Sequence, residues 1–171
     1  MSRGCQFCRP LQFKDVMDPS CVKSRTGYAI SICGCPVVWV SRLQTDIATA
    51  TMEAEYNALS MAMRDLLPLR TVFQTVVKGL DLSEDVTSTF KTTVWEDNMG
   101  CLKLANLQPG QYTTRSKHYA VKYHLFRSHL LERSNGTTVE YVETKLQKAD
   151  ILTKGLGTIN FKSGRKLLCG W

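Results

Sequence analysis

The sequence predicts an α/β fold in which helices pack on a mixed β-sheet. Segments with strand-like alternation come first, before residue 51, and helical and strand-like segments alternate along the rest of the chain. Strands followed by such alternation indicate a mixed sheet covered by helices. With 171 residues, of which 43% are hydrophobic and 22% charged, the chain has the size and composition of one globular domain with its own core.

Strands are expected where apolar and polar residues alternate in a β-rich composition. Residues 27–33, GYAISIC, and residues 37–41, VVWVS, have this pattern and are separated by the turn-like GCP. A third short strand is expected over residues 45–50. The sequence therefore predicts two or three antiparallel strands on tight turns, preceded by an irregular segment over residues 1–26.

A long helix is predicted from residue 51, with Thr51 as the expected N-cap. Its apolar residues recur at helical spacing and are Met52, Tyr56, Leu59, Met63 and Leu66. Pro68 should kink or end this helix, because proline lacks the N–H of a helical hydrogen bond. The apolar pattern continues beyond Pro68, and Gly79 is a fitting stop.

The remaining elements are predicted from the same kinds of pattern. In chain order they are a strand over 90–97, a short helix over 101–107, a basic loop over 110–118, an amphipathic helix over 119–133, a turn at Asn135-Gly136, a strand over 137–143 and a short helix over 147–156 that ends at Gly155.

Two glutamates near the start of the long helix are expected to face different directions. At ~100° per residue, Glu55 lies roughly 45° from the centre of the apolar stripe, and Glu53 lies more than ~100° away. Glu53 is therefore expected to face solvent, where it interacts favourably with the helix macrodipole. Glu55 is expected at the edge of the buried face, where a carboxylate needs a partner or a metal ion.

Two further acids stand at the ends of predicted elements. Asp97 closes an apolar strand, and Asp150 opens the last short helix directly after another strand. Taken alone, Asp150 reads as an N-terminal helix charge or cap. Together with Glu55, the two aspartates would supply the oxygen ligands that Mg²⁺ prefers.

Five segments carry a family resemblance. They are SRTGYAISICGCPVVWVS, TATMEAEYNALSMAMRDLLPLR, VWEDNMGCLKLA, TTRSKHYAVKYHLFR and VEYVETKLQKADILTKGL, and they cover roughly residues 19–156. In this order they resemble the ribonuclease H domain of copia-type retrotransposon polyproteins. Any one match has little weight, whereas five in order are specific.

The resemblance implies a ribonuclease H-like mixed sheet whose first strand is truncated or degenerate. It divides the chain into a first-strand remnant over residues 1–18, a ribonuclease H-like domain over 19–156 and a C-terminal tail over 157–171. Because the chain starts at Met1, the first half of that strand is expected to be absent. Residues 5–13 are expected to pair weakly in its place, which lowers stability.

The resemblance also implies an activity. The family cleaves the RNA strand of RNA–DNA hybrids with four carboxylates and two Mg²⁺ ions. Glu55 of EAEY, Asp97 of WEDN and Asp150 of KADILTK match three of these carboxylates. In an intact polyprotein a reverse transcriptase domain is expected upstream, and the protein is expected in a cytoplasmic particle or the nucleus.

The fourth carboxylate, an Asp in the family's first strand, has no match. The corresponding stretch is GCQFCR, residues 4–9, in which Gly4 replaces the Asp and Gln6 replaces a second acid. Asp15 or Asp18 would substitute only if the loop were rethreaded. We expect weak or absent cleavage. The alternative is a nucleic-acid-binding remnant that has no catalytic function.

The net charge of +7 and the pI near 9.1 suit a polyanionic partner such as nucleic acid. By the resemblance, phosphates of the hybrid are contacted by a basic segment with Arg115, Lys117, His118, Lys122 and Arg127. The competing interpretation of these residues is a solvated helix face beside a charged loop.

Cysteine content and hydropathy bear on location. Seven cysteines without regular spacing, and the absence of a signal-peptide stretch, favour a reduced intracellular setting. No apolar run approaches the ~20 residues of a membrane span, so no membrane partner is expected. A zinc site is a rival interpretation of four thiols, Cys5, Cys8, Cys33 and Cys35, which otherwise read as free or buried cysteines.

Overall fold

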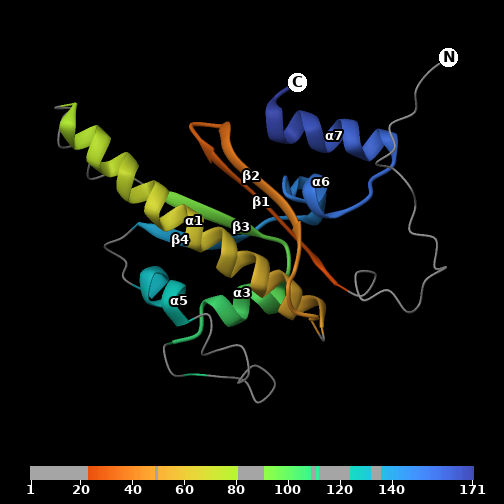
Figure 1. Cartoon of the computed structure of the whole chain (residues 1–171), viewed down its shortest axis with the longest axis horizontal. Coiled ribbons are helices and arrows are strands. Elements are labelled where there is room, and N and C mark those ends of the chain that lie inside the picture. The colour runs from red at the N-terminus through yellow and green to blue at the C-terminus, as the bar shows by residue number, and fades with distance from the viewer. Residues whose placement is uncertain (1–22, 49, 81–90, 109–110, 112–123, 132–135) are drawn as a thin grey trace. The chain divides into compact units, whose positions relative to one another are not determined.

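The computed structural model describes residues 23–48, 50–80, 91–108, 111, 124–131 and 136–171 (Figure 1). The chain forms two compact units. Unit 1 comprises Met1–Thr49 and Lys148–Trp171, and unit 2 comprises Ala50–Gln147. Each unit contains a two-stranded sheet and helices, so the described residues have the α/β character that the sequence predicts.

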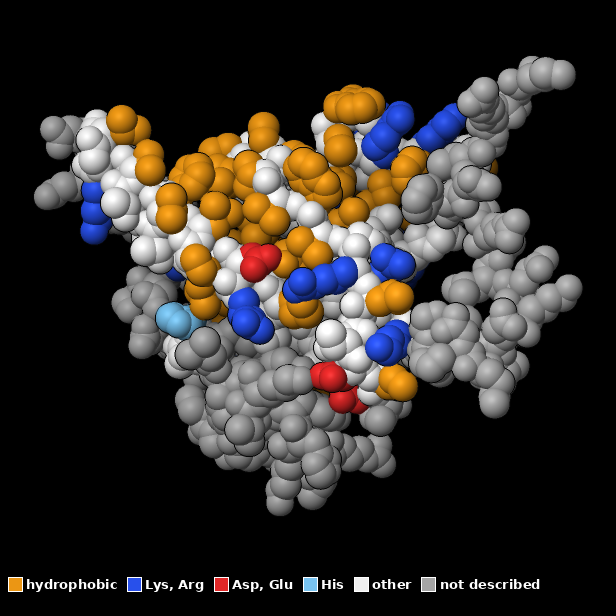
Figure 2. Space-filling model, in the orientation of Figure 1, with side chains coloured by type: hydrophobic (Ala, Val, Ile, Leu, Met, Phe, Trp, Pro, Cys, Tyr) orange, Lys and Arg blue, Asp and Glu red, His pale blue; other side chains and the backbone are white. Residues whose placement is uncertain are grey.

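Unit 1 begins with an antiparallel hairpin of β1 (Arg25–Ile32) and β2 (Cys35–Leu43). Both turn residues have positive φ, 51° at Cys33 and 83° at Gly34, as the two-residue turns that match strand twist require. These are the first two predicted strands. One face of β1 is buried, whereas Val37, Trp39 and Leu43 of β2 are exposed. Figure 2 shows hydrophobic side chains gathered where the hairpin lies in Figure 1.

The predicted third strand is absent from the described residues 45–48 and 50. The last backbone hydrogen bond between the two sides of the hairpin runs from the Gln44 N–H to the Ser24 carbonyl at 2.8 Å. Beyond it Thr45, Asp46 and Ile47 are exposed. The apolar residues of this stretch therefore have no neighbouring strand to pair with, and the prediction is wrong there.

Two helices complete unit 1, α6 (Asp150–Thr153) and α7 (Thr158–Cys169). The α6 helix packs on β1, and the Ser41 hydroxyl of β2 donates to the Leu152 carbonyl at 2.6 Å. The α7 helix lies in the segment that the sequence reading treated only as a tail. It ends at Gly170, whose φ of 83° is the left-handed C-cap conformation.

Unit 2 is built around α1 (Thr51–Gly79), which Figure 1 shows as one continuous helix. The N-cap is Ala50 rather than Thr51, and no side chain caps this end. The expected stop at Gly79 is confirmed. Pro68 lies inside the helix and does not end it, because the apolar pattern continues and Val77 is buried in the last turns.

The second sheet of the described residues is parallel and joins β3 (Thr92–Glu96) to β4 (Thr137–Tyr141). Three short helical elements accompany it, α3 (Met99–Ala105), α5 (His124–Leu131) and η3 (Thr144–Leu146). The sequence predicts one mixed sheet, whereas the described strands form two separate sheets. The segment expected to supply the first strand, residues 5–13, lies outside the described residues.

The core of unit 2 is the contact between α1 and α3. Six buried residues form it, three from each helix: Tyr56, Leu59, Met63, Cys101, Leu104 and Ala105. This core fixes the start of α3 against the first half of α1, and therefore positions the end of β3 beside α1. Among the described residues, no helix is long and apolar enough to cross a membrane.

Candidate functional site

The carboxyl end of β3 carries a buried acid that the sequence reading passed over. Glu96 is the last residue of the strand and is 6% exposed, whereas its neighbour Trp95 is 52% exposed. The sequence contained a sign of this orientation. Side chains alternate between the two faces of a strand, so Thr92, Val94 and Glu96 share one face. That face is the inner one, so the strand directs Glu96 and not Trp95 into unit 2.

Burial dominates the chemistry of Glu96. Together with the negative charges of Glu55 and Asp97, and against hydrogen bonds that lower it, burial raises the pKa of this carboxyl to about 7. One of these bonds comes from the Asn98 backbone N–H to Oε1 at 3.0 Å. A second comes from the Cys101 thiol. Glu96 is therefore a carboxyl that titrates near neutral pH.

Asn98 holds the junction between β3 and α3. Its side-chain Oδ1 accepts from the backbone N–H groups of Gly100, at 2.9 Å, and Cys101, at 3.1 Å, which is an N-cap of α3. The cap starts the helix directly after the strand and brings the buried Cys101 against Glu96. Burial raises the pKa of the Cys101 thiol, and the charge of Glu96 raises it further, so Cys101 stays a thiol.

Glu55 and Asp97, two of the three predicted site residues, belong to the same neighbourhood. Both are half-buried, and the charges of both act on Glu96 and Cys101. The structure therefore brings three carboxylates, Glu55, Glu96 and Asp97, to the carboxyl end of β3. We call this group the β3-end cluster.

The predicted contrast between the two α1 glutamates is only partly right. Glu53 is half-buried rather than solvent-facing, and Ser60, seven residues onward and thus on the same side of the helix, is buried at 5% exposure. Five consecutive residues of α1, 56 to 60, are buried, so the buried face is much wider than a stripe. What distinguishes the two acids is electrostatic: Glu55, and not Glu53, acts on Glu96.

Asp150, the third predicted site residue, stands in unit 1 as the first residue of α6. Its Oδ2 accepts from the Lys154 ammonium at 2.7 Å, one helical turn onward. This ion pair and the position at the helix start agree with the alternative interpretation of Asp150 as a helix N-terminal charge.

The described residues contain no group of three or more His, Cys, Asp or Glu side chains placed to hold a metal ion. Of the predicted magnesium ligands, Glu55 and Asp97 belong to unit 2 and Asp150 belongs to unit 1. The donor chemistry of Glu55 and Asp97 does suit Mg²⁺.

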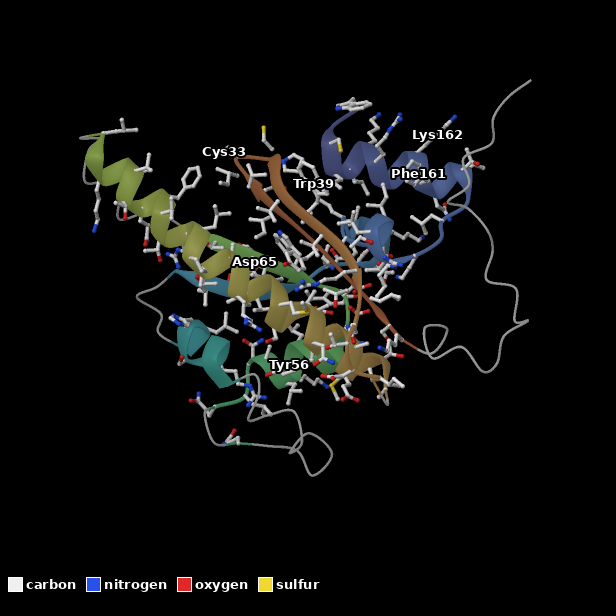
Figure 3. All side chains as sticks on the ribbon, in the orientation of Figure 1. Cys33, Trp39, Tyr56, Asp65, Phe161 and Lys162 are labelled. Carbon is white, nitrogen blue, oxygen red and sulfur yellow. The ribbon has the colours of Figure 1, made fainter. Side chains whose placement is uncertain are left out.

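The predicted nucleic-acid contacts are described for one residue. Arg115, Lys117, His118 and Lys122 lie outside the described residues. Arg127 is fully buried: its Nε donates to the Tyr56 hydroxyl at 2.8 Å, and its guanidinium lies over the Tyr56 ring (Figure 3). The prediction for Arg127 is therefore wrong, because the guanidinium is used inside unit 2 and presents no surface to a phosphate.

The known proteins similar to this chain include three Pol polyproteins. The sequence is 30% identical to the retrovirus-related Pol polyprotein from transposon TNT 1-94 of Nicotiana tabacum, over 85% of this chain and 10% of the relative. It is 28% and 27% identical to the Pol polyproteins from transposons RE2 and RE1 of Arabidopsis thaliana, in each case over 82% of this chain and 9% of the relative.

The chain spans about a tenth of the length of the curated relatives it matches. It is thus similar, over most of its own length, to one segment of retrotransposon Pol polyproteins, which supports a retrotransposon origin. No family model matches the sequence. No solved structure is significantly similar to it.

Proposed function

We propose that this chain is a retrotransposon-derived domain of the ribonuclease H type, directed at RNA–DNA hybrids, whose cleavage is weak or absent because Gly4 replaces the first-strand Asp. The observation that supports it best is the β3-end cluster, in a chain similar to Pol polyproteins. A reverse transcriptase domain as upstream partner, and a cytoplasmic particle or the nucleus as location, are part of the same proposal.

The residues of the β3-end cluster have different roles in this proposal. Glu55 and Asp97 are the residues that would hold Mg²⁺, and by the family resemblance Asp150 is a further ligand. When bound, such ions activate water and stabilise charge on the phosphate oxygens. Glu96 positions Asp97, because its Oε1 is bonded to the N–H of Asn98 and so fixes the backbone on both sides of that aspartate.

A cleavage assay tests the proposal. A labelled RNA–DNA hybrid is incubated with the full chain in Mg²⁺ or Mn²⁺, alongside Gly4→Asp, Asp97→Asn and, as a matched control, Glu53→Gln. We expect the unmodified chain to stay near background and Gly4→Asp to raise cleavage. Asp97→Asn added to Gly4→Asp should abolish the gain, and Glu53→Gln should leave it.

Two results would contradict parts of the proposal. Robust cleavage by the unmodified chain that Asp97→Asn abolishes would show that the site is complete without an acid at position 4. No gain from Gly4→Asp would show that the first strand is misplaced in the sequence comparison.

Metal binding has its own readout. A cation that binds the folded chain raises its melting temperature by mass action. We expect Mg²⁺ to raise the melting temperature of the unmodified chain and of Glu53→Gln, and to have a smaller effect on Asp97→Asn. Equal shifts for all three proteins would remove Asp97 from the proposed ligands.

The second candidate is nucleic-acid binding without catalysis, and the charge distribution favours it. Unit 1 holds eleven of the 22 Lys and Arg residues but only four of the 15 Asp and Glu residues. Unit 2 holds eleven of each kind. The whole net charge of +7 therefore belongs to unit 1, whereas the basic segment predicted to contact the hybrid lies in the neutral unit.

A further inference from the structure

The helix α7 presents cations that have no acidic partner in the described structure. From Ile151 to Trp171 the chain contains no acidic residue. The described ion pair of α6 joins Lys154 to Asp150, and none is recorded for the three cations of α7, which are Lys162, Arg165 and Lys166. This positive charge is thus uncompensated on an exposed helix.

Two of these cations lie on the outer side of the helix. Gly164 faces Ile151 of α6, and Leu168, one turn onward, is 7% exposed, so these residues mark the inner face. Lys162, labelled in Figure 3, and Lys166 are exposed and four residues apart, and the helical period places both on the opposite side. Like charges at this spacing weaken a helix, and an anionic partner would reverse this effect.

An aromatic ring stands beside the third cation. The Arg165 guanidinium lies 5.0 Å from the centroid of the Trp171 ring, and Trp171 is 73% exposed. A ring held by a cation and open to solvent is a surface on which a nucleic-acid base stacks, with a strength of roughly 1–3 kcal/mol per base. The three cations and the Trp171 ring all belong to the segment that follows α6 in the chain.

We propose that α7, through Lys162, Arg165, Lys166 and Trp171, is a nucleic-acid-binding surface that contacts the phosphate backbone and stacks one unpaired base on Trp171. Charge complementarity selects this partner, because all of the net positive charge lies in unit 1. A lipid surface fits less well, since Gly164 and the buried Leu168 mark the inner side of α7, and the exposed apolar residues Ile159 and Phe161 lie in its first turn, before both lysines. The inference rests on the nucleic-acid part of the proposed function and not on cleavage.

Binding is measured by fluorescence anisotropy with a labelled single strand and a labelled RNA–DNA hybrid, in EDTA so that no cleavage occurs. The test variant is Lys162→Gln with Lys166→Gln. The matched control is Lys78→Gln with Lys91→Gln, which removes the same charge from exposed lysines of unit 2. We expect the test variant to bind both probes about tenfold more weakly and to lower the salt slope by about two, with less than a twofold change in the control.

A third variant addresses the ring. Trp171→Ala should weaken binding of the single strand by roughly 5- to 100-fold and binding of the hybrid much less, since only an unpaired base stacks. Circular dichroism melts of each variant show whether it is folded, and Lys162→Arg with Lys166→Arg should restore binding if charge on this face is what matters.

Three outcomes would overturn the inference. They are no binding by the unmodified chain, an equal loss in the test and control variants, and unchanged binding by the test variant. If cleavage is observed while the α7 variants bind like the unmodified chain, this inference fails and the proposed function stands.

Discussion

The Nε of Arg127 donates to the Tyr56 hydroxyl at 2.8 Å, and both side chains are completely buried. The guanidinium also lies 5.7 Å from the centroid of the Tyr56 ring, so one residue of α1 supplies both an acceptor and a π face. A charge inside a protein needs such partners, because desolvation otherwise outweighs its interactions. This pair is therefore a polar contact that holds α5 against α1 in addition to their apolar packing.

Tyr56→Phe removes the acceptor and keeps the ring. We expect the free energy of unfolding, measured by urea denaturation, to fall by about 1–3 kcal/mol, because a buried donor loses its partner. The same substitution in an Arg127→Met background should cost much less. Equal losses in the two backgrounds would show that the hydroxyl stabilises the fold by a route other than Arg127.

Glu96 should make stability depend on pH. Burial and neighbouring charge raise its pKa from the usual 4.5 to about 7, so the folded state holds a proton that the unfolded chain releases over this interval. The contribution is present below pH 4.5 and is lost as pH rises through 7. In EDTA, Glu96→Gln should therefore be more stable than the unmodified chain by about 3 kcal/mol at pH 8, with the difference vanishing near pH 4.

The control for this pH dependence is Glu53→Gln, which removes an acid from the same neighbourhood of α1. Between pH 6 and pH 8 its melting temperature should differ from that of the unmodified chain by less than that of Glu96→Gln does. A Glu96→Gln difference that is flat between pH 4 and pH 8 would show that Glu96 is ionised in the folded state throughout.

Gly27 should not tolerate a side chain. A Cβ at this position would overlap the Thr153 methyl group and the Leu152 side chain of α6. We expect Gly27→Ala to lower the free energy of unfolding by about 1–3 kcal/mol, because a β-branched neighbour on a packed helix yields little. Gly155→Ala is the matched control, since nothing lies within 4 Å of its Cβ position. Equal effects would mean that α6 does not pack on β1 as described.

Pro68 should destabilise α1 at its position within the helix. It is exposed, lies inside the helix and has no N–H to donate to the carbonyl of Arg64. We expect Pro68→Ala to raise the melting temperature and the free energy of unfolding by up to about 3 kcal/mol. Val72→Ala, at another exposed position of α1, serves as the control and should change little. A destabilised Pro68→Ala would mean that the proline is needed for packing.

Local pattern was enough for most of the secondary structure. Alternation located β1 and β2, and helical spacing located α1 with its end at Gly79. The third strand failed because alternation is a property of the segment alone, whereas a strand needs a neighbour to pair with. The helix α7 was missed because its apolar residues are few and its outer face carries lysines, which resemble a solvated tail.

The site could be predicted only in part, for reasons that are also physical. Glu55 and Asp97 followed from their positions at a helix start and a strand end. Glu96 was overlooked although its register on β3 marks it as inward, because an acid is rarely expected on a buried face. Arg127 was misassigned because a basic residue in a basic segment gives no sign that a tyrosine 71 positions earlier will bury it.

Unit 1 is assembled from both ends of the chain, with all 98 residues of Ala50–Gln147 between its two parts. Closing a loop of this length has an entropic cost that must be met before the contact of Gly27 with α6 stabilises anything. During synthesis the hairpin leaves the ribosome long before α6 exists, while unit 2 can already fold as a continuous segment. Emergence of α6, and not emergence of the hairpin, should therefore set when β1 loses its exposure to chaperones.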